Sequence, residues 1–135
     1  MKNFLLNTLE NSKKYTLDVA VAMPEDGYNS KVTSDTWSFG DLLSHIAYGI
    51  EWWEHNYIKG IKKDWAPPVT KTSKKEVMDY LAAAYGGLTE TIAASHVNDE
   101  IVKGFFMTLD HITHHRGQAV IHLRKHGIVP PEYVF

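Results

Sequence analysis

The chain contains no cysteine among its 135 residues. It therefore cannot form disulfides, bind a metal through thiolates or use a thiol of its own as a nucleophile. Any thiol chemistry would need a small thiol supplied from outside the chain. The absence also suits a reducing compartment, and we expect a cytoplasmic protein.

Strong net charge and long apolar runs are missing as well. The formal net charge is −2 at pH 7, and the basic residues are scattered along the chain, so no basic surface for nucleic acid is expected. No stretch approaches the roughly 20 apolar residues of a membrane span. The first apolar run ends at Asn7, which is too short for the core of a signal peptide. We expect a soluble protein that binds neither nucleic acid nor membranes.

Four segments show the periodicity of amphipathic helices, and clusters of proline, glycine, asparagine and aspartate separate them. These segments cover approximately 3–23, 38–60, 73–95 and 104–126. The connection 59–72 is long for antiparallel neighbours, which favours a crossover along the bundle. We predict one all-α domain over residues 1–135, a four-helix bundle with a long crossover between its second and third helices.

Several residues predict where these helices begin and end. Ser38 and Asp41 resemble a capping box with aspartate in place of glutamate, and Ser73 and Glu76 match the capping box fully. Gly127 is typical of the residue that follows the last turn of a helix.

Histidines are the most informative residues in the chain. His111 and His115 are four residues apart, just over one helical turn, so their imidazoles share a face and can bind one metal ion. His45 lies at the edge of the apolar stripe of the second segment. A third imidazole from a neighbouring helix would complete a three-ligand site that leaves positions open for water or substrate. Three imidazoles plus water suit zinc, nickel, copper or iron.

Other interpretations of these histidines remain open. A lone histidine at a stripe edge is more often hydrogen-bonded or solvent-facing than a ligand, and the chain has eight histidines. A second pair at the same spacing, His122 and His126, competes with the first. His114 points about 60° away from His111, which favours a surface or supporting role. Gln118 and His122 are candidates to support the ligands or face a substrate, and each could equally be a hydrogen-bonded residue of the bundle.

Aromatic residues crowd the second helix, and most should belong to the core. They are Trp37, Tyr48, Trp52 and Trp53. Trp52 is the exception because it shares the edge of His45, and we predict that Trp52 and Gly49 wall a pocket beside the histidines.

Two competing motifs are absent. Ile112 follows His111, so the His-Glu-x-x-His pattern of zinc peptidases, with its built-in general base, does not occur. Glycine-rich phosphate loops are missing too.

Two charged residues lie near the predicted site. Asp41 is one turn before His45, but helix capping explains it more simply than catalysis. Arg116 falls near the apolar side of its helix, where it would need a carboxylate or carbonyl partner.

Two runs of sequence resemble motifs of the DinB/YfiT-like metalloproteins. Residues 109–118, Leu-Asp-His-Ile-Thr-His-His-Arg-Gly-Gln, resemble the last helix of that family, and residues 37–45, Trp-Ser-Phe-Gly-Asp-Leu-Leu-Ser-His, resemble its second-helix motif. The resemblance implies a four-helix bundle with a long crossover, often a homodimer. It also implies a divalent metal held by His45, His111 and His115.

The resemblance also suggests a function. Members of that family include metal-dependent transferases of low-molecular-weight thiols, a thiol-dependent isomerase and hydrolases, and the fold does not decide among them. We expect a metal-dependent enzyme that activates water or a small-molecule thiol and acts on a small-molecule substrate. One alternative is a metal or small-molecule binding bundle without catalysis, and another is a dimeric bundle with incidental histidines.

Overall fold

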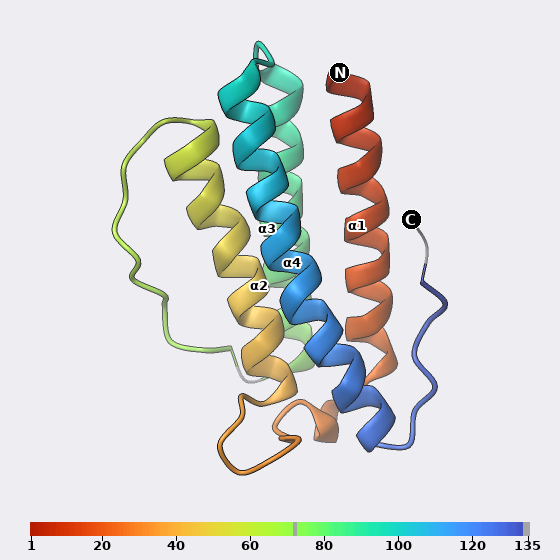
Figure 1. The fold of residues 1–135 in the computed structure, drawn as a ribbon. Coiled ribbons are helices and arrows are strands. Elements are labelled where there is room, and N and C mark those ends of the chain that lie inside the picture. Colours follow the sequence, from red (N-terminus) through yellow and green to blue (C-terminus); the bar gives the residue numbers. More distant parts are fainter. Residues whose placement is uncertain (72, 134–135) are drawn as a thin grey trace.

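The computed structural model describes residues 1–71 and 73–133 and consists mainly of four long helices (Figure 1). They are α1 (Lys2–Ala22), α2 (Phe39–Trp53), α3 (Lys74–Ala94) and α4 (Asp99–Lys125), with the short turns η1 (Glu25–Gly27) and η2 (Glu54–Ile58). The predicted all-α four-helix bundle is confirmed.

The crossover between α2 and α3 sets the order of the helices in space. After η2 the chain passes along the outside of the bundle and begins α3 at the same end as α2 (Figure 1). α2 and α3 therefore run in one direction, and α1 and α4 run in the other. α2 packs against both α3 and α4. α2 therefore lies between α3 and α4, and α4 is the helix that carries two of the predicted ligands.

The helix ends follow local hydrogen bonding. The Ser38 hydroxyl accepts the Asp41 N–H at 3.1 Å, and the Asp41 carboxylate accepts the Ser38 N–H at 3.2 Å, as a capping box requires. At the end of α4, Gly127 has a φ of +78°, and Ile128 donates its N–H to the Leu123 carbonyl at 2.9 Å. This is a Schellman ending, which favours glycine because other residues rarely adopt positive φ. The predicted start of α2 and the predicted end of α4 are both confirmed.

The predicted start of α4 was wrong. The helix begins at Asp99 rather than 104, because the Asn98 side chain accepts the Ile101 N–H at 2.9 Å and caps it. Gly104 lies inside the helix, where an added Cβ would be 2.9 Å from the Tyr57 Cβ and 3.0 Å from the Tyr57 carbonyl oxygen. The glycine therefore marks a close contact between helices, not a helix end.

The second helix reaches Ile58, but its last turn is a π-helix. The Lys59 N–H bonds to the Glu54 carbonyl, five residues back, at 2.8 Å. The wider turn rotates the following side chains. Tyr57 is consequently 40% exposed, whereas Ile58 is buried. Gly60, with a φ of +70°, ends the segment as predicted.

The core draws on all four helices. Its fully buried side chains include Leu5, Leu9, Val19, Phe39, Leu43, Ile46, Ile50, Leu81, Tyr85, Leu88, Phe105 and Ile112. A buried carboxylate at its edge, Glu54, accepts a hydrogen bond from the Thr91 hydroxyl and lies 3.3 Å from the Lys59 ammonium, so its charge is partnered. None of the helices described here has both the length and the apolar character needed to cross a membrane.

Gly104→Ala should destabilise the fold by about 1–2 kcal/mol. Overpacking against fixed backbone costs about 1–3 kcal/mol, and the gain in helix propensity returns up to about 1 kcal/mol. Gly86→Ala is the matched control, since its added Cβ meets nothing within 4 Å, and it should stabilise the protein. Urea unfolding followed by circular dichroism measures both. Equal effects of the two substitutions would contradict the close contact at Gly104.

Candidate metal centre

The structure brings His45, His111 and His115 together. Their potential ligand atoms all lie within 4.8 Å of one another. The Nε2 atoms of His45 and His111 are 2.9 Å apart, so one donates a hydrogen bond to the other. His45 comes from α2 and the other two from α4, so the group exists only because these helices pack together.

Gly49 makes room for His111. A Cβ at Gly49 would lie 2.3 Å from Cε1 and 2.5 Å from Nδ1 of the His111 ring. The ring is therefore in contact with the backbone of α2, and its Nδ1 is buried without a hydrogen-bond partner. On its other side it stacks on Trp53 with ring centroids 4.8 Å apart. The α2 backbone and Trp53 together fix the plane of this imidazole.

Burial keeps the three imidazoles neutral at pH 7. Burial, reinforced by the neighbouring histidines, lowers the pKa of His45 to about 4 and that of His111 to about 3. Burial also lowers the pKa of His115, against the opposing effect of its hydrogen bond to Gln118. Each neutral imidazole keeps one lone pair that can bind a metal, so binding at neutral pH would require no net release of a proton.

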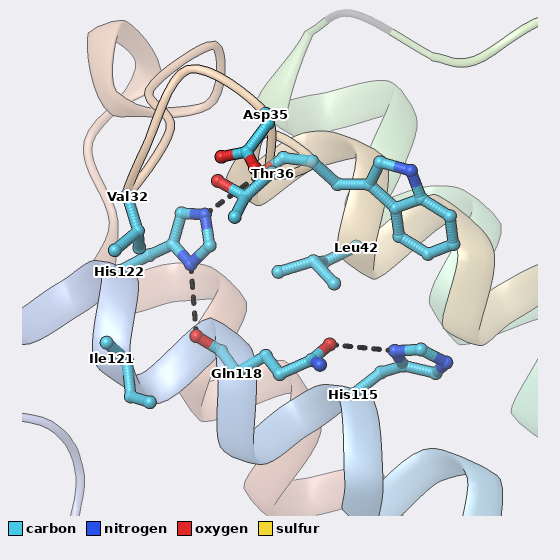
Figure 2. Close-up of a pocket in the computed structure, with 9 residues that line it drawn as sticks. Val32, Asp35, Thr36, Leu42, His115, Gln118, Ile121 and His122 are labelled. Carbon is cyan, nitrogen blue, oxygen red and sulfur yellow. Dashed lines mark hydrogen bonds between the residues drawn. The ribbon is translucent and has the colours of Figure 1, made fainter.

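Gln118 orients His115. The His115 Nδ1 donates to the amide oxygen of Gln118 at 2.9 Å (Figure 2). Because that oxygen can only accept, Nδ1 carries the proton and Nε2 is left with the lone pair. Metal-binding histidines commonly have such a partner on the second ring nitrogen.

His122 joins α4 to the loop before α2. Its buried ring places Nδ1 3.0 Å from the Gln118 carbonyl oxygen and Nε2 3.1 Å from the Trp37 carbonyl oxygen. Within residues 1–71 and 73–133, His122 and His126 do not form a group that could hold a metal. His114 is exposed, with its ring 4.8 Å from that of His115.

Trp37 does not belong to the core, contrary to prediction. It is 48% exposed, and its ring lies 4.6 Å from the ring of His45 and 5.7 Å from that of His115. Trp37 directly precedes the N-cap of α2, so it lies off the apolar stripe and folds over the histidines from outside.

The crossover supplies a second tryptophan that sequence reasoning missed. The ring of Trp65 lies 5.5 Å from those of His45 and Trp52. The next residue, Ala66, donates its N–H to the Tyr48 hydroxyl at 2.8 Å and holds the crossover against α2. An aromatic residue before Ala-Pro-Pro in a polar connection was the available signal.

Two cavities adjoin the histidines, one on each side of Trp37. The loop pocket, of about 410 Å³, lies between the loop before α2 and α4, and His115 and Gln118 line it. The crossover pocket, of about 320 Å³, reaches His45 and is lined by Ser44 and Tyr80. Trp37 lines both. Gly49 and Trp52 line neither of these two cavities: Gly49 contacts His111, and Trp52 packs against Trp65.

Arg116 has the carbonyl partner that its position required. It is 5% exposed, and its Nη1 lies 3.3 Å from the Ser12 carbonyl oxygen and 3.2 Å from the Thr16 hydroxyl. Its guanidinium also lies 4.8 Å from the centre of the Tyr15 ring. These contacts fix α4 to α1, on the side of α4 away from α2.

Comparisons with known proteins relate the chain to one family. The model of the DinB family matches residues 1–103, a region that includes His45 and ends before His111 and His115. The crystal structure of a DinB-like protein from Bacillus cereus ATCC 10987 superimposes with a TM-score of 0.80 at 17% sequence identity, covering 97% of this chain and 95% of that chain. At that identity the likeness shows the fold alone. A search of curated proteins found no match.

Gly49→Ala should displace the His111 ring and break its hydrogen bond to His45, because the new methyl group would occupy the position of the ring. The side chain can rotate away, so the loss of stability should stay below about 3 kcal/mol. Nitrogen-detected NMR of the imidazoles measures the change. Gly117→Ala is the control: Gly117 follows His115 by two residues, its added Cβ meets nothing within 4 Å, and the His45 and His111 signals should stay in place. Unchanged signals in Gly49→Ala would contradict the contact.

Proposed function

This chain belongs to the DinB family, and from that premise we propose that it is a divalent-metal protein whose ion is held by His45, His111 and His115. The observation that carries the proposal is the meeting of three half-buried imidazoles from two helices, with ligand atoms within 4.8 Å of one another. Supporting observations are the lowered pKa values of all three side chains.

The donor set fits such an ion. Two zinc–nitrogen bonds of roughly 2.1 Å at a tetrahedral angle place their nitrogen atoms roughly 3.4 Å apart. The present spacings run from 2.9 Å, between His45 and His111, to no more than 4.8 Å. Small side-chain rotations would therefore suffice. Three neutral imidazoles without a carboxylate suit zinc, nickel, copper or iron, and geometry alone does not select one.

We propose further that the centre is catalytic, of the thiol S-transferase or hydrolase type. A divalent ion held by three neutral ligands would lower the pKa of a bound water or small thiol toward neutral. The residues of the chain would orient the ligands through Gln118 and shield them with Trp37. A transferred thiol would have to be a cosubstrate because the chain has no cysteine.

A second candidate is a metal or small-molecule binding protein without catalysis. It is favoured because no buried carboxylate that could act as a general base lines either cavity in the described residues. The carboxylates lining the two cavities in the described residues are Asp35, which is exposed, and Asp41, which caps α2. Neither is placed as a buried general base.

The proposal extends to the state of the protein in the cell. We propose a single-domain chain that forms a homodimer in the cytoplasm. Support comes from the family resemblance and from large apolar side chains exposed on α1 and α4, Phe4 and Phe106.

Metal stoichiometry tests the proposal. Protein stripped with a chelator and reloaded should bind close to one ion per chain, and His45→Ala or His115→Ala should remove most of it by elemental analysis. His114→Ala is the matched control because that histidine is exposed and outside the group. Helicity should persist in every variant. A His115→Ala protein that still binds one equivalent would refute the ligand assignment.

Thiol binding tests the thiol branch of the proposed chemistry. The cobalt(II)-loaded protein should gain a near-ultraviolet sulfur-to-cobalt charge-transfer band when 2-mercaptoethanol is added. Because the chain has no cysteine, the added thiol is the only source of such a band. His45→Ala should not show it, whereas His114→Ala should. A loaded wild-type protein without the band would exclude the thiol branch and leave hydrolysis or binding.

A further inference from the structure

We propose that the loop pocket binds small neutral molecules with an apolar body and a carbonyl oxygen at one end, and that this oxygen lies beside Gln118 and His115. The orientation toward the histidines rests on the proposed metal function, whereas binding in the pocket does not.

The walls of the pocket define the apolar body. Val32 and Leu42 face Ile121 of α4 across the space, and Trp37 also lines it (Figure 2). The volume, about 410 Å³, lies in the range of small-molecule sites. These walls would favour a ring or a short branched chain.

One end of the pocket offers a hydrogen-bond donor. The Gln118 amide oxygen is occupied by His115. Its amide nitrogen donates to no acceptor in residues 1–71 and 73–133, although it carries two hydrogens. A ligand oxygen at this end would receive one of them. It would also lie next to His115, and so next to the proposed ion.

The charge at the pocket disfavours anions. Asp35 lines the pocket as a carboxylate, and the hydrogen bond from the Thr33 hydroxyl lowers the pKa of this carboxyl. No lysine or arginine lines the pocket, and Lys125 donates to the backbone carbonyls of Lys31 and Val32. A neutral ketone should therefore bind better than a carboxylate of the same shape.

The pocket is held open by contacts that do not need a ligand. The His122 ring lies within hydrogen-bond distance of the Trp37 and Gln118 carbonyl oxygens, and so links the loop to α4 (Figure 2). Lys125 makes a second link, to Lys31. A preformed site loses little free energy to ordering when it binds.

The test is an NMR titration of the metal-free protein with acetophenone, toluene and benzoate. We expect acetophenone to shift the Trp37 indole and Gln118 amide signals in a saturable way. It should bind about three- to tenfold more tightly than toluene, the usual size of one hydrogen bond. Benzoate should bind more weakly than acetophenone. Gln118→Leu should abolish the advantage of acetophenone over toluene.

Ile121→Trp should block the pocket. Val21→Trp is the matched control, because both side chains are 55% exposed on helices and only Ile121 lines the cavity. Urea unfolding should show both variants folded. Non-saturable shifts, or equal acetophenone binding by the two variants, would overturn the pocket. Benzoate binding as tightly as acetophenone would overturn the ligand class.

Zinc separates this inference from the proposed function. With zinc bound, acetophenone should bind several-fold more tightly and toluene should not change. Bound zinc without that effect would overturn the orientation toward the histidines. Failure of zinc to bind at all would refute the proposed function, and the metal-free titration would still decide the pocket.

Discussion

The close approach of α2 to α4 is the constraint on which the rest of the structure depends. Each helix contributes a glycine where the other segment presents a large side chain: Gly49 against His111, and Gly104 against Tyr57. A side chain at either glycine would have to displace the neighbour that now fills the gap. The 2.9 Å contact between His45 and His111 would then be lost. The histidine group is thus a product of backbone packing as much as of its own side chains.

This packing also explains the electrostatics of the site. Imidazoles half-buried between two closely packed helices lose part of their solvation, and three of them together disfavour a positive charge on any one of them. The result is a group of neutral imidazoles, one of which, His111, has a buried Nδ1 without a hydrogen-bond partner. Unpartnered buried polar atoms cost stability. A cation bound by one nitrogen of each ring would be stabilised by these neutral imidazoles.

The sequence was sufficient to predict the four helices and the crossover, because amphipathic periodicity and capping residues are local signals. It also indicated His111 and His115 as a pair and His45 as a candidate third ligand, and the family resemblance strengthened the assignment of His45. Gly104 misled the prediction because glycine both ends helices and permits close packing, and only the partner helix distinguishes the two roles. The π-turn at Glu54–Ile58 and the contacts of Trp37 and Trp65 depend on tertiary packing of segments far apart in the chain, which periodicity cannot report.

The ring contacts around the histidines involve every tryptophan in the chain. There are four in the sequence: Trp37 and Trp65 contact His45, Trp53 stacks on His111, and Trp52 contacts both Trp53 and Trp65. α1, α3 and the body of α4 contribute none. The intrinsic fluorescence of this protein therefore originates almost entirely within a single shell about the candidate site. In most proteins tryptophan emission averages over the whole molecule. Here its intensity and wavelength should respond mainly to groups that enter or leave this shell.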